Sequence, residues 1–386
     1  MIRVLGKGLT AQAIKEEFED VTLYDSSDFD TYDLNSNDPT VVSPGISPFN
    51  EMVKKANNVM SDYDLVYEDM PFSIWISGTN GKTTTTQMCQ HILKDKQSVC
   101  GGNIGIPISK LDKNTKIWIL ETSSFTFHYT KLAKPNLYLL LPISDDHVSW
   151  HGSFEEYEKA KLKPLYMMEE GEIAIVPYKY KDIETKCHLI TYKDSDDLCS
   201  KFNIDKSKIN FKEPFLLDAL LSLAAKSILF DEVDYKSINT YKVDEHKVEE
   251  LKDKKQRLWI NDSKATNIDA TINALIPYKE NRIYLILGGD DKGANLEPLF
   301  EFLKDLDIEI YAIGSNSNRI ISFCKKNLIK FIESNTLENA VSEISRKHDN
   351  KALAILSPAA ASLDQYTSYK QRGKEFKNFV NSLSFI

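Results

Sequence analysis

Short apolar runs alternate along the chain with polar or helix-forming stretches, and glycine or serine follows many of these runs. The apolar runs are residues 2–5, 21–25, 40–43, 74–77, 117–121, 137–141, 173–176, 258–260, 283–287, 308–313 and 352–356. Stretches with the length and spacing of helices lie between several of them, for example at 83–94 and 154–168. Strands joined by crossover helices are typical of parallel sheets that carry helices on their faces. The pattern therefore predicts an α/β fold.

The run at 74–77 leads into a polar turn with glycines, followed by a lysine and hydroxyl residues. This segment consists of Gly78, Thr79, Asn80, Gly81, Lys82, Thr83 and Thr84. Backbone N–H groups of such a loop, together with the N-terminus of the next helix, can bind phosphate. Lys82 would place a positive charge between the terminal phosphates, and Thr83 would offer a hydroxyl to Mg²⁺. The usual pattern has glycine where this chain has Ile76, so we interpret the segment as a shortened phosphate loop.

The strands fall into three groups along a chain of 386 residues, which is too long for one ordinary core. We predict a small Rossmann-like N-terminal unit at residues 1–71 and a central P-loop ATPase-type parallel sheet at 72–243. A C-terminal Rossmann-like, doubly wound sheet is predicted at 244–386. Within the central region, residues 179–212 are charged and weakly patterned, which predicts irregular strands and loops. Because ligands bind outside the carboxyl ends of strands in such sheets, the loops at those ends are the candidate sites.

Acidic residues follow two strands of the central region. Glu121 closes one strand, a position suited to a Mg²⁺ ligand or a water-positioning group, although a solvated strand-end glutamate is the alternative. Asp145, Asp146 and His147 follow another strand, where either aspartate could instead cap a helix. Lys161 lies in a helical stretch rich in alternating charges, a pattern that by itself predicts a solvated lysine.

Composition excludes several classes of protein. The net charge of −9 argues against a nucleic-acid-binding protein. The five cysteines show no C-x-x-C spacing, which suits reduced thiols in a cytoplasm and gives no metal-binding motif. No apolar run approaches the ~18–20 residues needed to span a bilayer, and the first residues lead straight into a glycine turn rather than a signal peptide. We expect a cytoplasmic monomer that is not inserted in a membrane.

The phosphate loop resembles the shortened loop of the Mur ligases and folylpolyglutamate synthases. Segments at 101–107, 121–125 and 146–147 match motifs of that family in the same order. Segments at 261–267, 287–290 and 356–366 narrow the resemblance to the D-glutamate-adding Mur ligases. The resemblance covers essentially the whole chain.

The resemblance implies three domains and an ATP-dependent reaction of peptidoglycan precursor synthesis. ATP would phosphorylate the L-alanyl carboxylate of UDP-MurNAc-L-Ala, and the amine of D-glutamate would attack the acyl phosphate. The products would be an amide, ADP and phosphate. The implied cofactors are two Mg²⁺ ions, and the implied partners are the two small-molecule substrates.

The resemblance also implies roles for particular residues. It implies catalytic roles for Lys82, Glu121, His147 and Lys161. The metal ligands would be Thr83, Glu121, His147 and a carbamylated Lys161. Besides residues 78–84, the implied ATP-binding residues are Lys247 and Asp262. For the UDP-sugar they are Gly8, Leu9, Thr10, Ser43, Gly45, Asn103, Ser123 and His147. For D-glutamate they are Lys264, Thr266, Lys292, Ser362 and Tyr369, the last at a position where these ligases often have Phe.

Some positions depart from the family. The segment that reaches adenine reads as residues 214–218, ending in Asp218, instead of His-Asn-x-x-Asn. The pair His246-Lys247 replaces His-Arg, and lysine cannot reproduce the arginine fork. Trp150 occupies the place of an arginine that follows the metal-binding histidine.

Two alternatives remain open. One is another amide ligase of the Mur or folylpolyglutamate type. Against it, the Asp-Asn-Pro-Arg loop of the diaminopimelate-adding members is absent here, and folylpolyglutamate synthases lack the N-terminal nucleotide-sugar unit that residues 2–45 resemble. The other is a nucleotide-binding regulatory protein without catalysis.

Overall fold

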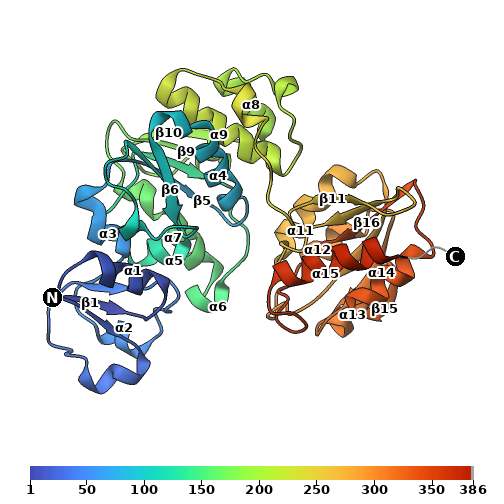
Figure 1. Ribbon diagram of the computed structural model, residues 1–386, viewed down its shortest axis with the longest axis horizontal. Helices are drawn as coiled ribbons and strands as arrows, with labels where there is room; N and C mark the ends of the chain where they lie inside the picture. Colours follow the sequence, from blue (N-terminus) through green and yellow to red (C-terminus); the bar gives the residue numbers. More distant parts are fainter. Residues whose placement is uncertain (384–386) are drawn as a thin grey trace. The chain divides into compact units, whose positions relative to one another are not determined.

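The computed structural model describes residues 1–383 and divides into two compact units (Figure 1). The first unit comprises Met1–Phe211 and Phe215–Tyr241, and the second comprises Lys212–Pro214 and the chain from Lys242 onward. The first unit contains two sheets and the second unit contains one.

The N-terminal sheet has the strand order β2-β1-β3-β4, and all of its pairings are parallel. Its strands are β1 (Ile2–Leu5), β2 (Val21–Tyr24), β3 (Thr40–Val42) and β4 (Val59–Met60). Helix α1 (Leu9–Glu17) covers one face, where Ala11 and Ile14 pack against Val4 and Val41. Helices α2 (Glu51–Lys55) and α3 (Asp62–Val66) follow β3 and β4.

The central sheet has the strand order β10-β9-β8-β5-β7-β6 and is entirely parallel. Its strands are β5 (Phe72–Ser77), β6 (Ser98–Gly102), β7 (Ile117–Glu121), β8 (Leu137–Leu140), β9 (Ile173–Pro177) and β10 (His188–Tyr192). Its helices are α4 (Lys82–Ile92), α5 (Ser124–Tyr129), α6 (Val148–His151), α7 (Phe154–Met167), α8 (Ser195–Phe202), α9 (Phe215–Phe230) and α10 (Tyr235–Ile238).

Both faces of the central sheet are buried, which explains why its strands read as nearly continuous apolar runs. Along β5, Ile74 and Ile76 face α4 and α9, whereas Trp75 faces α5 and α7. Alternate residues of a strand point to opposite faces, so each apolar run supplies two cores.

The prediction of irregular structure at 179–212 is wrong. The segment contains β10, which pairs with β9, and the helix α8. β10 is the edge strand, and four of its five residues are exposed or only partly buried. Because an edge strand buries few of its side chains, the sequence of β10 shows only a weak apolar pattern.

The second unit has a six-stranded mixed sheet in the order β11-β12-β16-β13-β14-β15. Its strands are β11 (Glu249–Lys252), β12 (Leu258–Asn261), β13 (Arg282–Leu287), β14 (Ile308–Ile313), β15 (Lys330–Asn335) and β16 (Ala352–Leu356). Its helices are α11 (Ile268–Leu275), α12 (Glu297–Leu303), α13 (Ser317–Lys326), α14 (Leu337–Ser345) and α15 (Tyr369–Ser382). The first three helices cover one face and the last two cover the other, as predicted for a doubly wound sheet. The antiparallel edge strand β11 was not predicted.

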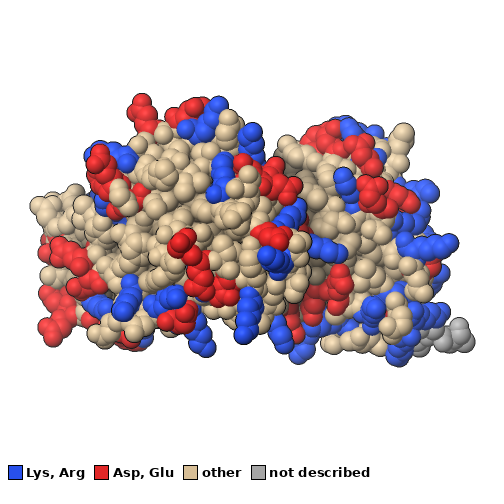
Figure 2. Space-filling view, turned by 90° about the horizontal axis from the view of Figure 1, so that it is seen from above, with Lys and Arg blue, Asp and Glu red and all other residues tan. Residues whose placement is uncertain are grey.

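Side chains of both charges are interspersed over the surface drawn in Figure 2. Within residues 1–383, no helix is both long enough and apolar enough to cross a membrane.

A buried ion pair fixes the β11–β12 hairpin of the second unit. The Nε atom of Arg257 donates to Asp253 Oδ2 at 2.7 Å, and the Trp259 indole N–H donates to the same oxygen at 2.9 Å. Arg257 Nη1 also donates to the carbonyl oxygens of Ser345 and His348, each at 2.8 Å. The guanidinium therefore ties the hairpin to the end of α14 and to the segment that follows it.

Replacing Asp253 by Ala should lower the free energy of unfolding of the second unit by about 3–5 kcal/mol, because Arg257 would stay buried without its counter-ion. Urea denaturation followed by circular dichroism would measure this loss. The matched control is Glu301→Ala, which breaks an exposed pair with Lys304 and should change stability by about 0.5 kcal/mol or less. Equal effects of the two substitutions would contradict the structural role of Asp253.

Candidate active site

Two glycines shape the loop between β5 and α4. Gly78 has φ +144° and Gly81 has φ +84°, conformations that side chains rarely adopt. A Cβ atom at Gly78 would lie 2.5 Å from the Cβ atom of Leu141, and one at Gly81 would lie 2.5 Å from Asp218 Oδ1. Gly81 precedes α4 and provides no side-chain cap, so the first N–H groups of the helix can bind an anion.

Lys82 folds back over this loop. Its Nζ atom donates to the carbonyl oxygens of Gly78 at 2.9 Å and Thr79 at 2.7 Å. The loop is also fixed from its other side, since the Thr79 hydroxyl donates to the Ser144 carbonyl oxygen at 3.0 Å. The hydroxyls of Thr79 and Tyr157 lie 3.0 Å apart, a contact that the sequence analysis did not identify.

Glu121 joins two of the predicted site residues at the carboxyl end of β7. Its Oε2 atom accepts from the Thr83 hydroxyl at 2.7 Å, and its Oε1 atom accepts from the Asn103 amide at 2.6 Å. The glutamate is only 2% exposed, so the alternative of a solvated strand-end glutamate is wrong.

The pair of Thr83 and Glu121 has the chemistry of a Mg²⁺ site that relies on phosphate for its other ligands. Mg²⁺ bound to nucleotides usually takes one or two protein oxygens together with phosphate oxygens and water. Among residues 1–383, no group of three or more His, Cys, Asp or Glu side chains is arranged to hold a metal ion. Thr83 and Glu121 are two candidate oxygen ligands for such an ion.

Lys161 is buried against the same loop, with 1% of its surface exposed. Its Nζ atom donates to the Gly78 carbonyl oxygen at 2.8 Å and to Ser77 Oγ at 3.3 Å. Burial, followed by the positive charge of Lys82, lowers the pKa of Lys161 well below the ordinary lysine value. The expectation of a solvated lysine from the charge pattern alone is wrong. The missed signal is the spacing of Tyr157, Lys161 and Leu165, which places the lysine on the apolar face of α7.

His147 lies at the beginning of α6 with the left-handed φ of 54°. Its ring centroid is 4.8 Å from that of Phe125, and its Nε2 atom is 3.6 Å from Asp146 Oδ2. His147 itself is the cap residue of α6, so neither Asp145 nor Asp146 caps a helix there.

Trp150, at the position of the missing arginine, packs in an aromatic cluster beside His147. Its ring centroid lies 4.4 Å from that of Phe125 and 4.5 Å from that of His151. The Nε2 atom of His151 is 2.9 Å from the Ser124 hydroxyl, and burial is the main reason that the pKa of His151 falls to about 4. The sequence analysis did not single out His151. The adjacent Ser123 caps α5 by accepting from the Thr126 N–H at 3.1 Å.

The N-terminal residues predicted for the UDP-sugar lie in loops at the carboxyl ends of β1 and β3. Gly8, Leu9 and Thr10 begin α1, and the Leu9 side chain is exposed. Ser43 and Gly45 follow β3. A Cβ atom at Gly6 would lie 2.4 Å from Ser43 Oγ, so the two loops are in close contact.

The second unit brings Lys264 and Tyr369 together, with the lysine Nζ atom 4.6 Å from the centre of the tyrosine ring. Lys292 is exposed, with a left-handed φ of 50°, and Ser362 is buried. Their two loops are joined by a backbone bridge between Asp290 and Ala361. No hydrogen bond or ion pair of Thr266 places it against the other four residues in the described part of the chain.

The buried side chain of Arg372 forms hydrogen bonds with the backbone of these loops. The sequence analysis did not identify this residue. It donates to the Ser263 carbonyl oxygen at 2.9 Å and to the Ala360 carbonyl oxygen at 3.1 Å. Burial lowers the pKa of Arg372 to about 10, which still leaves the guanidinium charged at neutral pH.

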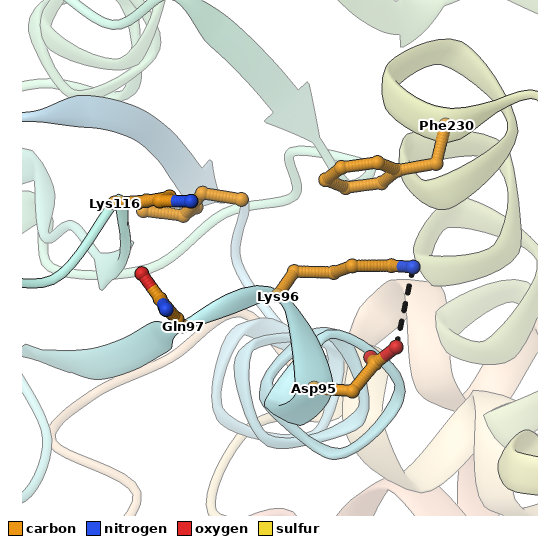
Figure 3. A pocket seen from close by; sticks show the side chains of 6 residues that line it. Asp95, Lys96, Gln97, Lys116 and Phe230 are labelled. Atoms are coloured by element: carbon orange, nitrogen blue, oxygen red, sulfur yellow. Dashed lines mark ion pairs between the residues drawn. The ribbon is translucent and has the colours of Figure 1, made fainter.

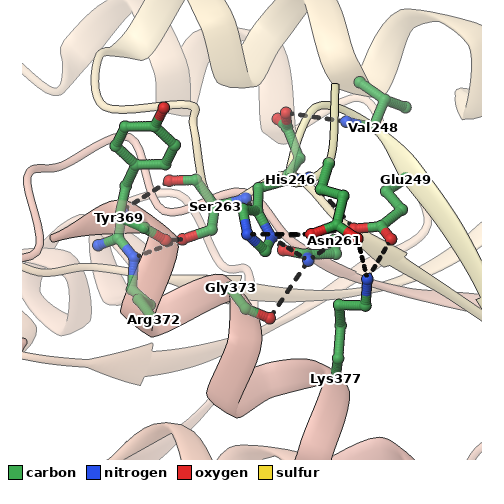
Figure 4. A network of polar contacts seen from close by, with 11 residues as sticks. His246, Val248, Glu249, Asn261, Ser263, Tyr369, Arg372, Gly373 and Lys377 are labelled. Atoms are coloured by element: carbon green, nitrogen blue, oxygen red, sulfur yellow. Dashed lines mark hydrogen bonds and ion pairs between the residues drawn. The ribbon is translucent and has the colours of Figure 1, made fainter. Parts of the chain in front are cut away.

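His246 belongs to a polar network in the same unit (Figure 4). Asp262 joins this network through the Val248 N–H. Asp262 accepts from the Ser357 hydroxyl at 2.7 Å and from the Val248 N–H at 3.2 Å, and burial raises its pKa to about 7. His246 Nδ1 lies 2.8 Å from the Asn261 amide nitrogen. Lys247 forms an ion pair with Asp244 at 3.0 Å.

A cavity of about 360 Å³ lies at the amino ends of β6 and β7, opposite the edge that carries the phosphate loop (Figure 3). Its lining residues are Asp95, Lys96, Gln97, Lys116, Ile117 and Phe230. Five of these residues lie where β6 and β7 begin, and Phe230 is the last residue of α9. None of the six is a predicted site residue. Lys96 forms an ion pair with Asp95 at 3.2 Å, so its charge is already compensated.

Comparison with known proteins places this geometry in a family. Residues 76–213 match the Mur ligase middle domain. The chain is 47% identical over 400 residues to a protein of Campylobacter jejuni (strain RM1221), with 99% of this chain and 100% of the relative covered. It is 41% identical over 417 residues to one of Helicobacter pylori (strain ATCC 700392 / 26695), with 98% and 99% covered. Both relatives are named "UDP-N-acetylmuramoylalanine--D-glutamate ligase".

Among solved structures, the MurF ligase of Thermotoga maritima in complex with ADP has the same fold. The TM-score is 0.62 at 17% identity, with 98% of this chain and 93% of that chain covered. This likeness supports the fold assignment, and the identity along the whole chain supports the family. The chain therefore belongs to the Mur ligase family, and within it to the UDP-N-acetylmuramoylalanine–D-glutamate ligases.

Proposed function

We propose that the protein is the ATP-dependent ligase that adds D-glutamate to UDP-N-acetylmuramoyl-L-alanine in peptidoglycan precursor synthesis. The observation that carries this proposal is the 47% identity to a ligase of that name over the full length of both chains. We also propose that the reaction takes place in the cytoplasm and that the active protein is a monomer. The proposed domains are residues 1–71, 72–243 and 244–386.

In the proposed reaction, an oxygen of the L-alanyl carboxylate attacks the γ-phosphorus of ATP, and the bond to the β-phosphate oxygen breaks. The D-glutamate amine then attacks the acyl carbon, and the tetrahedral adduct releases phosphate as the amide forms. Both attacking groups must approach a polyanion, so the principal requirements are positioning and charge neutralisation. Residues 78–84 supply N–H groups to the phosphates, and Lys82 supplies a mobile positive charge.

Thr83 and Glu121 would hold one Mg²⁺ ion, and His147 with Lys161 would help to hold a second. When bound, the ions neutralise charge on the triphosphate and polarise the transferring group. The 2.7 Å contact between Thr83 and Glu121 fits the first assignment, because the two oxygens already converge. For the second assignment, His147 lies in the loop after β8 and Lys161 lies against the phosphate loop.

We propose that Lys161 is carbamylated in the active protein. Only a neutral amine attacks carbon dioxide, and burial of Lys161 favours the neutral form. A carbamate would keep one N–H for the Gly78 carbonyl oxygen, which the lysine already contacts at 2.8 Å. It would also add two oxygens and a negative charge to a position beside the phosphate loop.

The remaining predicted residues are proposed to bind the two other substrates. Gly8, Leu9, Thr10, Ser43, Gly45, Asn103, Ser123 and His147 are proposed for the UDP-sugar. Lys264, Thr266, Lys292, Ser362 and Tyr369 are proposed for D-glutamate, whose two carboxylates require cations and hydroxyls. Lys247 and Asp262 are proposed for ATP. The hydrogen bonds that Asp262 accepts from Ser357 and Val248 indicate that it acts by positioning those loops.

The purified protein with Mg²⁺-ATP and UDP-MurNAc-L-Ala should release ADP when D-glutamate is added. Mass spectrometry should show a product heavier by one glutamyl unit, and L-glutamate should give none. The absence of product with either isomer, despite binding of both nucleotides, would favour a regulatory binding protein instead.

Replacing Lys161 by Ala should lower kcat by about 100-fold or more, because a group that stabilises charge in the transition state is lost. Added acetate or formate should restore part of the activity by supplying the missing carboxylate. Lys159→Ala is the control, since Lys159 lies on the same helix and its side chain is 73% exposed. Unchanged turnover in the Lys161 variant would remove this residue from the site.

Replacing Lys292 by Ala should raise the KM for D-glutamate by about 10- to 100-fold, the expected loss for a hydrogen bond to a charged group. The KM for ATP should stay within about twofold. Lys279→Ala provides a control, because Lys279 is an exposed lysine of the same unit. Equal increases in both KM values would contradict the assignment of Lys292 to the amino acid.

A further inference from the structure

Lys292, the lysine proposed to bind D-glutamate, has an unusual backbone conformation. Its φ of 50° and the φ of 78° at Gly293 both lie in the left-handed region. A lysine rarely adopts this conformation, which persists only where the surrounding structure fixes the backbone. The Lys292 side chain is exposed, and within residues 1–383 its ammonium group forms no hydrogen bond or ion pair. The question is therefore what fixes this backbone.

Two aspartates fix the turn from within the loop that follows β13. Asp290 Oδ1 accepts from the Lys292 N–H at 3.1 Å, and Asp291 Oδ1 accepts from the Gly293 N–H at 2.9 Å. The Ala294 N–H donates to the Asp291 carbonyl oxygen at 2.9 Å. Aspartate is suited to such turns because its short side chain can accept from an N–H two residues later. The turn therefore sets the direction in which the Lys292 side chain leaves the loop.

The second carboxylate oxygen of Asp291 is bound from outside the loop. The Asp291 side chain is only 7% exposed, and its Oδ2 atom forms an ion pair with Nη1 of Arg319 on α13. Nη2 of the same guanidinium donates to the Ala294 carbonyl oxygen at 2.9 Å, and Asn316 Nδ2 donates to Asp291 Oδ2 at 2.9 Å. A planar guanidinium with two separate donors can hold both ends of the loop in one geometry. We call Asp291, Asn316 and Arg319 the α13 clamp.

The α13 clamp is itself fixed to the sheet of the second unit. Asn316 is buried, its Oδ1 atom accepts from the Gly289 N–H at 3.0 Å, and its own N–H donates to the Gly289 carbonyl oxygen at 3.2 Å. A Cβ atom at Gly314 would lie 2.6 Å from the Cα atom of Gly289, so the loops after β13 and β14 are in direct contact. On the other side of β13, the backbone bridge between Asp290 and Ala361 joins the loop after β16. Both neighbouring strands therefore support the loop that carries Lys292.

A fixed backbone matters for a lysine that binds its ligand from an exposed loop. The long side chain loses rotamer freedom when its ammonium binds a carboxylate, and ordering of the loop would add to that loss. Because the turn is fixed before the substrate arrives, only the Lys292 side chain has to be ordered. The expected consequence is tighter binding of a carboxylate, with no change in the steps that involve ATP.

We propose that the α13 clamp is a positioning element for Lys292, which it holds in the orientation that binds a carboxylate of D-glutamate. This inference rests on the proposed function for the identity of the amino acid. Asp291 and Arg319 are positioning residues that act through Lys292 and do not contact the substrate. The sequence analysis did not identify either residue.

The test measures steady-state kinetics of the full-length protein. Asp291→Ala should raise the KM for D-glutamate by about tenfold and change kcat and the KM for ATP by less than about twofold, because only the orientation of Lys292 is lost. Arg319→Ala should have the same effect, and since Arg319 is 43% exposed it tests the same ion pair if Asp291→Ala does not fold. The matched control is Lys326→Ala, which breaks an exposed ion pair of α13 with Glu297 and should change none of these constants. An unchanged KM for D-glutamate in the Asp291 and Arg319 variants, or equal increases for D-glutamate and ATP, would overturn the proposal.

A double variant separates positioning from a general structural role. In a Lys292→Ala background, Asp291→Ala should change the KM for D-glutamate by less than about twofold, because the group that the clamp positions is already absent. A further increase as large as that of the single variant would show that Asp291 does not act through Lys292, and would overturn the proposal.

Hydrogen exchange tests the loop without the reaction. Amide exchange in residues 289–294 should be about tenfold faster in Asp291→Ala, since the Gly293 N–H loses its acceptor, and unchanged in Lys292→Ala. Unchanged exchange in the Asp291 variant would overturn the proposal. If the unmodified protein forms the D-glutamyl product but the clamp variants have its normal KM, only the positioning assignment fails. If no product forms, the proposed function fails, and the exchange rates still decide whether the clamp fixes the loop.

Discussion

The space around Gly78 and Gly81 is the constraint on which the site depends. Both residues have backbone conformations that favour glycine, and a side chain at either would collide with Leu141 or Asp218. This close approach lets the chain turn from β5 directly into α4 and leaves the first N–H groups of the helix available to a phosphate. The neighbouring loops are then fixed against the turn by Thr79 and Lys161.

Several polar groups of the site are buried and already have partners. Glu121 is held by Thr83 and Asn103, and Lys161 is held by the carbonyl oxygen of Gly78. A buried polar group without a partner is costly, so these contacts order the loops before any substrate arrives. Preordering of this kind reduces the reorganisation needed for phosphoryl transfer, whose catalysis is mainly positioning and electrostatic stabilisation. In the second unit, Arg372 and Asp262 order the loops in the same way, through hydrogen bonds to Ser263 and from Ser357.

The order of strands decides what surrounds the phosphate loop. Because β5 lies between β7 and β8, the loop has a carboxylate on one side and, on the other, a cavity whose lining includes Tyr178, Tyr180 and Tyr192. Asp218 stands in the segment where the family has an asparagine near adenine. Asp218 has a structural contact instead, with Thr85 of α4.

The sequence by itself determined the α/β alternation, the phosphate loop and the family, because these depend on local spacing and on short motifs such as Gly81-Lys82-Thr83. The charge pattern alone could not determine whether Lys161 points to solvent or into the protein. The sequence also did not show that β10 pairs with β9, or that Arg257 and Asp253 form a buried ion pair. Those features depend on contacts between residues far apart in the chain, which no local window contains. Burial lowers the pKa of Lys161 and sets the cost of separating the Arg257–Asp253 pair, and only the packed tertiary structure establishes burial.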